Sequence, residues 1–283
     1  MILVTGATGN TGRAVTEALI RRGAAVRAMV RQETDRGRLP AAAEMAVADF
    51  GDTASVAAAL RGTDAAYLVT PSSEHAEAQQ KRFADLAVQA GTRHLVVLSQ
   101  LGADERSPVR FLRYHAAVEK HIEDLAIGHT FLRPNLFFQG LLAFAPTIAG
   151  QGQFHAPIGD AKISAVDVRD IAAVAAVTLT EPGHEGTTYT VTGPSAITHA
   201  DMAAALTTAL GRDVTFTDVP PEVFATKLDG ILPPWQIQGL LEDYAHYRRG
   251  EAAAVSLATP EITGKPAIGI TQFAHDYARA FAG

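Results

Sequence analysis

The stretch Val4–Gly12 reads V-T-G-A-T-G-N-T-G, and it decides the fold. It directly follows a short apolar strand predicted over Met1–Val4. Gly6 permits a tight turn from strand to helix, Gly9 leaves room for a pyrophosphate near the backbone, and Gly12 lets the next helix pack closely. The free N–H groups at the start of that helix favour phosphate. The residues predicted to contact a dinucleotide here are Gly6, Thr8, Gly9, Asn10, Thr11 and Gly12.

A second apolar strand is predicted over Ala25–Val30, which completes the context that a dinucleotide-binding unit requires. The end of that strand selects the cofactor, because an acidic residue there binds a ribose whereas an arginine pairs with a 2′-phosphate. Arg31 occupies this position, so the sequence favours NADP(H) over NAD(H). Glu33 lies close enough to keep NAD(H) open, while Arg36 and Arg38 add positive charge.

The composition excludes several classes of protein. With 283 residues, 47% of them hydrophobic, the chain is long enough for one large domain or two small ones. Its 24 basic and 30 acidic residues give a net charge of −6 without a basic block, which argues against nucleic acid as the main ligand. The absence of cysteine excludes disulfides and thiolate catalysis, and the scattered histidines lack the spacing of metal ligands.

The start of the chain bears on its location. The first predicted strand begins at Met1, which leaves no room for a signal peptide, and no apolar run is long enough to span a bilayer. We therefore expect a cytoplasmic protein without a membrane partner. A homodimer stays open.

Strands and helices alternate through the first half of the chain. The predicted strands are Met1–Val4, Ala25–Val30, Glu44–Val47, Ala65–Val69, Leu95–Leu98 and Thr130–Leu132. The predicted helices are Arg13–Arg22, Thr53–Leu60, His75–Ala90 and Arg113–Leu125. This order indicates an α/β protein with a doubly wound parallel sheet, a Rossmann fold.

Ligands in such a sheet bind outside the carboxyl ends of the strands. We expect Asp49 to hydrogen-bond the adenine amino group, and Thr70 and Pro71 to lie along the ribose and nicotinamide. The predicted cofactor contacts at these strand ends are Asp49, Phe50, Val69, Thr70, Pro71, Ser99, Gln100 and Pro134.

The pattern changes after Pro134, where a cluster of phenylalanines and leucines follows the last strand of the cleft. Substrate sites are mostly apolar with a few polar groups, so this cluster is a candidate pocket wall. The predicted substrate contacts are Gln100, Phe137, Phe138, Leu141 and Trp235.

Two domains are predicted on this basis. Residues 1–150 form the cofactor-binding domain, and residues 151–283 mostly form a small, mainly helical substrate lobe. Residues 163–192 are expected to return to the sheet through a strand, a helix cap at Asp167 and an apolar helix. The chain is expected to end in one amphipathic helix over Ile270–Phe281.

The chain resembles the NmrA-like branch of the atypical short-chain dehydrogenases/reductases over nearly its full length. The segments that carry the likeness are T-G-A-T-G-N-T-G from Thr5, D-A-A-Y-L-V-T-P-S from Asp64, R-Y-H-A-A-V-E-K-H-I-E from Arg113, H-T-F-L-R-P-N-L-F-F from His129, T-V-T-G-P-S from Thr190 and T-G-K-P from Thr263. The resemblance implies a Rossmann domain with a C-terminal substrate lobe and NADP(H) binding. Some members reduce quinones, dyes or other conjugated substrates, and others bind the nucleotide as redox sensors.

The catalytic motif of the wider superfamily is missing. That superfamily uses a tyrosine to donate a proton and a lysine, four residues later, to bind the nicotinamide ribose. Aligning the chain on Glu119 places Phe111 at the tyrosine and His115 at the lysine. Ser99 ends its strand, but Leu101 stands where the superfamily's serine usually falls.

His115 is the first choice for ribose contact or proton supply, because its ordinary pKa of about 6.5 suits either charge state. Tyr114 is the second candidate for the catalytic step. Glu119 and Glu123 lie on one helix face near Lys120 and are interpreted as surface pairs.

The sequence therefore predicts an NADPH-dependent reductase of a planar, conjugated, mostly apolar acceptor such as a quinone. A quinone places its charge on a delocalised oxygen, so one weak donor or solvent suffices for the proton. A nucleotide-sensing regulatory protein of NmrA type is the alternative from another class. Reduction of an enone, imine or carbonyl in a biosynthetic pathway is the third interpretation.

Overall fold

Seven short strands form a parallel sheet in the order β3-β2-β1-β4-β5-β6-β8. Every residue of the central strands β1, β4 and β5 is buried, whereas the edge strands β3 and β8 are largely half-buried or exposed. The structure is a computed structural model that describes all 283 residues. The strands are β1 (Ile2–Val4), β2 (Val26–Val30), β3 (Glu44–Val47), β4 (Ala65–Leu68), β5 (His94–Leu98), β6 (Gly128–Pro134) and β8 (Thr187–Val191). Successive strands are added on one side of β1 up to β3, and from β4 onward on its other side. This change of strand order beside β1 confirms the predicted Rossmann fold.

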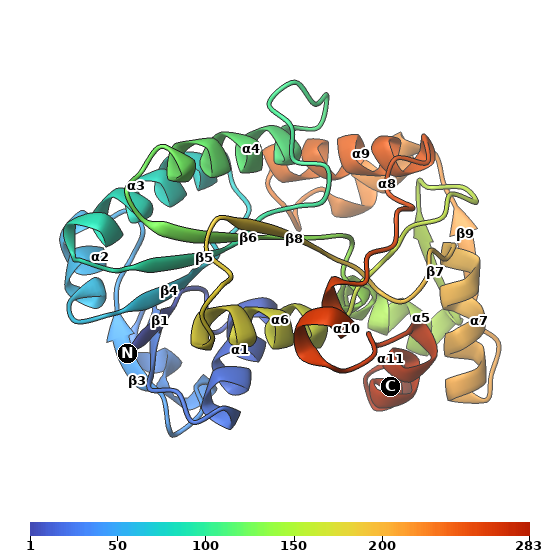
Figure 1. The fold of residues 1–283 in the computed structure, drawn as a ribbon. Helices are drawn as coiled ribbons and strands as arrows, with labels where there is room; N and C mark the ends of the chain where they lie inside the picture. The colour runs from blue at the N-terminus through green and yellow to red at the C-terminus, as the bar shows by residue number, and fades with distance from the viewer.

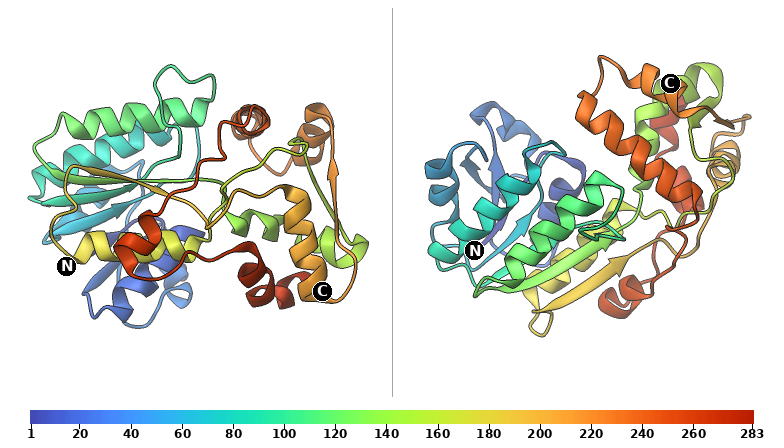
Figure 2. Two further views of the ribbon diagram at one scale, coloured as in Figure 1. Left: turned by 45° about the vertical axis from the view of Figure 1, so that its right-hand side comes forward. Right: turned by 90° about the horizontal axis from the view of Figure 1, so that it is seen from above.

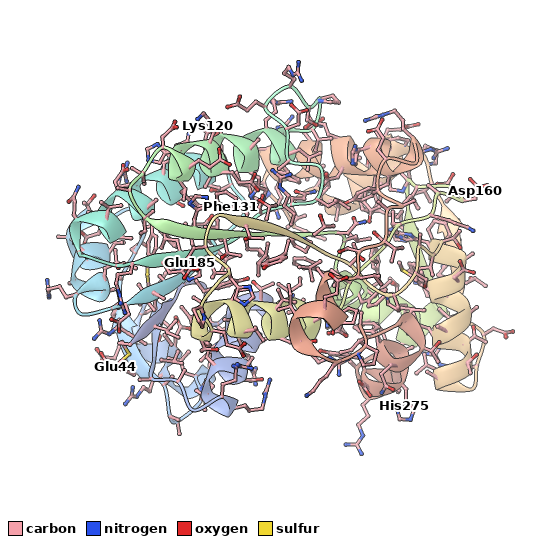
Figure 3. The ribbon with its side chains drawn as sticks, in the orientation of Figure 1. Glu44, Lys120, Phe131, Asp160, Glu185 and His275 are labelled. Carbon is pink, nitrogen blue, oxygen red and sulfur yellow. The ribbon has the colours of Figure 1, made fainter.

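Helices cover both faces of this sheet (Figure 1). Side chains alternate along a strand, so Val4 packs toward one helical layer and its neighbour Leu3 toward the other. The first layer holds α1 (Asn10–Arg21) and α6 (Val168–Thr180). The second layer holds α2 (Thr53–Leu60), α3 (Ala76–Gln89) and α4 (Arg110–Glu123). Phe131 of β6 is buried beneath this second layer, whereas Lys120 of α4 points outward (Figure 3).

A second lobe, with its own core around Phe154 and Phe273, lies beside the sheet (Figure 2). A two-stranded parallel sheet joins β7 (Gln153–Ala156) to β9 (Thr215–Asp218) within it. Its helices are α5 (Ala145–Gln151), α7 (His199–Leu210), α8 (Pro221–Leu228), α9 (Pro234–Arg248), α11 (Ile270–Asp276) and α12 (Ala278–Ala282). The remaining elements are the 3₁₀ helices η1 (Glu33–Arg38) and η2 (Phe138–Phe144), and helix α10 (Ala258–Thr263).

Two predicted elements differ in the structure. Residues 163–166 form only isolated bridges, with Ile163 opposite Ile197, because this segment runs between the lobes instead of entering the sheet. The return to the sheet is made by α6, capped by Asp167 as predicted, and by β8 beside β6. The expected C-terminal helix is broken at Tyr277, whose ring stacks on Phe273.

Two helices begin earlier in the sequence than predicted, and therefore closer to the edge of the sheet at which its strands end. Helix α1 begins at Asn10 instead of Arg13, and α4 begins at Arg110 instead of Arg113. No helix combines the length and the apolar character that crossing a bilayer requires.

The two lobes meet where α9 lies against α4 (Figure 2). Arg110 pairs with Glu242 at 2.7 Å and its backbone N–H donates to the same carboxylate at 2.8 Å. The Phe111 ring lies directly on Gly239, so a Cβ added at that glycine would overlap the ring. Trp235, one turn before Gly239 on α9, also packs against Phe111, with ring centroids 5.3 Å apart.

This packing predicts that Gly239→Ala destabilises the protein by about 1–3 kcal/mol, because an extra methyl group must displace the Phe111 ring. The free energy of unfolding in urea measures the effect. The matched control is Gly150→Ala in α5, where an added Cβ meets no atom and should stabilise the helix by about 0.5–1 kcal/mol. Equal stability of the two variants would contradict this account of the α4–α9 contact.

Candidate functional site

A cavity of about 630 Å³ opens at the carboxyl ends of the sheet strands and extends to the second lobe. Its walls come from the turn after β1, the ends of β2, β4, β5 and β6, and helices α4 and α9. This is the edge at which doubly wound sheets bind ligands. Its volume is in the range of small-molecule and cofactor sites.

The glycine turn forms one wall of the cavity. Gly6 has φ of +57°, a left-handed conformation, and an added Cβ would lie 2.8 Å from Val69 Cγ1. Gly12 packs against the backbone carbonyl of Gly6, which leaves no space for any side chain there. Gly9 precedes α1 and offers no capping side chain, so the first N–H groups of the helix stay free for an anion. The turn residues that line the cavity are Gly6, Thr8, Gly9, Asn10 and Thr11, whereas Gly12 lies behind them.

Positive charge gathers where β2 ends. Arg31 and Arg38 both line the cavity and are exposed to it, whereas Glu33 and Arg36 are not part of the wall. Arg38 is held in place, because its Nη2 donates to the Thr8 carbonyl at 3.1 Å and its Nη1 pairs with Asp35 at 3.0 Å. Two guanidinium groups beside a helix N-terminus match the charge of a 2′-phosphate.

The predicted strand-end residues also reach the cavity. The structure places Asp49, Phe50, Val69, Thr70, Pro71, Ser99, Gln100 and Pro134 in its wall. Asp49 Oδ1 accepts from the Gly51 N–H at 2.7 Å, which fixes the carboxylate orientation. Thr70 Oγ1 accepts from Gln80 Nε2 at 2.8 Å.

His115 lies in the same wall, on the buried side of α4. Burial and, to a smaller extent, the charge of Arg133 lower the pKa of His115 to about 3. The imidazole is therefore neutral at physiological pH, which removes the predicted option of an imidazolium proton donor. Its Nδ1 is buried without a hydrogen-bond partner in the protein.

Glu119 lies one turn after His115 on α4. It is buried, so the prediction that it is a surface residue is wrong. It receives two hydrogen bonds from the Arg133 guanidinium on β6, one of them at 3.0 Å. This ion pair ties α4 to the sheet beside His115. The predicted partner Lys120 instead pairs with Asp124.

Tyr114 stands next to His115, with ring centroids 4.1 Å apart. Burial and the nearby Asp243 carboxyl raise the pKa of the Tyr114 hydroxyl well above its usual value. The phenol lines the cavity and is a weak acid there.

Phe138, Leu141 and Trp235 do not line the cavity, contrary to the prediction. Phe138 and Leu141 are turned by the 3₁₀ helix η2 into the core of the second lobe, where Phe138 lies 5.4 Å from Phe273 between ring centroids. Trp235 packs outside the cavity, with the Arg110 guanidinium 5.6 Å above its ring. Of the predicted apolar substrate contacts, only Phe137 lies in the wall.

The sequence interpretation missed the contribution of α9. Asp243 and Tyr247 reach into the cavity from this helix, and Gln100 Nε2 donates to both Asp243 oxygens at 3.0 and 3.2 Å. Burial is the main cause that raises the pKa of Asp243 to about 7. No linear pattern singles Asp243 out, because it stands among charged and aromatic residues of a helix far along the chain.

The model of the NmrA-like family matches residues 1–255. The chain belongs to this family. It is 38% identical to a (4-alkanoyl-5-oxo-2,5-dihydrofuran-3-yl)methyl phosphate reductase of Streptomyces griseus, over 100% of this chain and 99% of that protein. It is 35% identical to an NAD(P)H azoreductase of Xenophilus azovorans, over 99% of both chains. The crystal structure of an NADPH-dependent quinone oxidoreductase of Escherichia coli with NADPH matches with a TM-score of 0.86 and 30% identity, over 97% of this chain and 98% of that chain.

The low pKa of His115 predicts that its ring does not titrate between pH 5 and 8. Imidazole NMR signals of the protein, followed over this pH range, test the prediction. The signal that disappears in His115→Gln identifies the residue. A pH-dependent shift of that signal with a midpoint near 6.5 would show a solvated, chargeable ring and contradict the burial described here.

Proposed function

We propose that this protein is an NADPH-dependent reductase that transfers hydride to a planar, conjugated, uncharged acceptor, with quinones as the leading class. The observation that carries the proposal is the polarity of the cavity. The charged side chains Arg31, Arg38, Asp35 and Asp49 line the end near β2 and β3. The end near β5, β6 and α9 carries aromatic rings and a single buried carboxyl, Asp243. Two similar proteins, an NAD(P)H azoreductase and an NADPH-dependent quinone oxidoreductase, agree with this arrangement.

We infer that NADP(H) binds along this cavity wall. The space in front of Gly9 and the N-terminus of α1 would hold the pyrophosphate, and Arg31 with Arg38 would hold the 2′-phosphate. Asp49 would meet the adenine, and the neutral imidazole of His115, which lines the cavity, would lie against the nicotinamide ribose. When bound, the dihydronicotinamide supplies a hydride.

The chain's own residues orient the two reactants and exclude water. Phe111 stands at the position of the superfamily's tyrosine and has no proton to give. Such a site suits an acceptor whose reduced form is a stabilised anion, because the proton transfer then needs little assistance. Tight positioning in an apolar pocket supplies the remaining rate enhancement.

The charge of the wall also limits the acceptor. Beyond Arg31 and Arg38 no lysine or arginine lines the cavity, so nothing at the acceptor end would pair with a phosphate on a substrate. The relative from Streptomyces griseus is named for a phosphate-bearing substrate. We therefore favour an uncharged quinone, azo compound or enone over an anionic acceptor.

The arginine pair predicts a selective defect in Arg31→Ala. Loss of the guanidinium should weaken NADPH binding by about tenfold or more, since a charge-assisted contact to phosphate is worth about 1.5–3 kcal/mol. NADH binding should change less than twofold. Fluorescence titration with both nucleotides measures the two dissociation constants, with Arg36→Ala, outside the wall, as the matched control. Equal weakening of NADPH and NADH by Arg31→Ala would refute the 2′-phosphate role.

An acceptor panel tests the function itself. Purified protein should oxidise NADPH with naphthoquinones, aromatic azo compounds or enones well above the rate without protein. Gly9→Val should abolish nucleotide binding and turnover together, because its side chain would fill the pyrophosphate space. Tight NADPH binding without turnover of any acceptor would instead favour the nucleotide-sensing function.

A further inference from the structure

A buried carboxyl stands at the acceptor end of the cavity without a cation beside it. Asp243 is 6% exposed and lines the wall together with Tyr114 and Tyr247. Its oxygens accept only from the neutral amide of Gln100, at 3.0 and 3.2 Å. The next residue, Glu242, has its own cation in Arg110 and lies outside the wall. A carboxyl that is buried without a cation favours its neutral, proton-bearing form.

The groups around Asp243 determine which of them can give up a proton. Those that face it are Gln100 after β5, Tyr114 on α4, and Glu242, Tyr244 and Tyr247 on α9. Burial and the Glu242 charge raise the pKa of Asp243 to about 7, and the Gln100 hydrogen bond opposes this shift. Burial raises the pKa values of the three tyrosines above their usual value, and it lowers that of His115 to about 3. Asp243 is thus the residue in the wall that holds a proton and can release it near neutral pH.

We propose that Asp243 is a catalytic residue that protonates the acceptor during its reduction, and that Gln100 is a positioning residue for this carboxyl. The inference rests on the proposed function. The second lobe of the protein would then supply the acid. In the wider superfamily a tyrosine on the Rossmann domain is the acid, and the family resemblance aligns Phe111 with that tyrosine. The acceptor is a neutral molecule with an oxygen or nitrogen at the end of its conjugated system.

The step balances in electrons and protons. The acceptor gains a hydride, with its two electrons, from the dihydronicotinamide. One π bond of the acceptor breaks, and its electron pair moves to the terminal oxygen or nitrogen. The O–H bond of Asp243 breaks, its proton forms the new O–H or N–H bond, and the Asp243 carboxylate regains a proton from water. One NADPH and one proton are consumed for each acceptor reduced.

Two carboxyl variants in the second lobe test the proposal. Asp243→Asn keeps the size of the side chain and an oxygen that accepts from Gln100, but it has no acidic proton. Glu222→Gln on α8 is the control, because that carboxyl is exposed and lies outside the cavity. For each protein we would measure kcat for a naphthoquinone and for an enone from pH 5.5 to 9. NADPH affinity is measured in the same samples by fluorescence.

Comparing kcat for the two acceptors distinguishes a proton-donating role of Asp243 from a purely structural role. An enone forms a more basic anion than a quinone, so it depends more on the acid. Asp243→Asn should lower kcat by about 100-fold or more for the enone and by about tenfold or less for the quinone. The wild-type kcat for the enone should fall above pH 7, and Asp243→Asn should lose this dependence. Glu222→Gln should keep it, and NADPH affinity should stay within about twofold in both variants.

A measurement without turnover reports the protonation of Asp243 directly. An unfolded aspartate loses its proton near pH 3.9 and the folded Asp243 near pH 7, so the folded state binds the extra proton between these values. The stabilising contribution of this group is complete below about pH 4 and is lost as the pH rises to about 7. The Tm of the wild type minus the Tm of Asp243→Asn should therefore decrease as the pH rises from about 4 to about 7.

Three results would overturn the catalytic role of Asp243, and only one of them would also overturn the reductase function. Unchanged kcat in Asp243→Asn, or an equal loss with both acceptors, would overturn the catalytic role while the reductase function stands. Wild-type protein that binds NADPH but turns over neither acceptor would overturn the proposed function and the catalytic role with it. A Tm difference that does not vary with pH would show that Asp243 is ionised at neutral pH and cannot be the acid.

Discussion

The contact between α4 and α9 is the constraint on which the acceptor end of the cavity depends. It is built from one ring on one glycine, Phe111 on Gly239, and from the Arg110–Glu242 ion pair beside them. Because this close approach fixes the position of α9, it also fixes Asp243 one residue beyond Glu242. The residues that form the wall and the residues that hold the lobes together are neighbours on the same two helices.

The charged groups that would bind the cofactor phosphate and the neutral groups near the acceptor lie at different ends of the cavity. Arg31 and Arg38 are exposed in the cavity wall, and Arg38 is held there by its contacts to the Thr8 carbonyl and to Asp35. His115 and Asp243 are buried, and burial moves their pKa values in opposite directions toward the neutral forms. The reacting end is thus polar but uncharged, which suits hydride transfer to an uncharged acceptor.

Most of the Rossmann domain could be predicted because its signals are local. The central strands are short apolar runs and the glycine turn has a fixed spacing, so the sequence predicts β1 to β6 within a few residues of their observed bounds. It does not predict β7 and β9, because each has only four residues and too little alternation of apolar and polar side chains. The cofactor end of the wall follows from the strand ends for the same reason.

The acceptor end could not be predicted, because it is made by contacts between distant segments. Phe138 and Leu141 looked like pocket residues by their place after β6, but the 3₁₀ geometry of η2 turns them into the lobe core. Asp243 joins Gln100 across 143 positions of sequence, a distance at which no spacing rule applies.

The α4–α9 contact gives a physical reason for an apolar ring at position 111, which the family resemblance aligns with the superfamily's tyrosine. The Phe111 ring lies on Gly239 and 5.3 Å from Trp235 between ring centroids, and a phenol hydroxyl buried there would need a hydrogen-bond partner. An apolar ring at this position stabilises the docking of α9, and α9 brings the Asp243 carboxyl to the cavity. The same packing that favours phenylalanine at position 111 therefore also places Asp243.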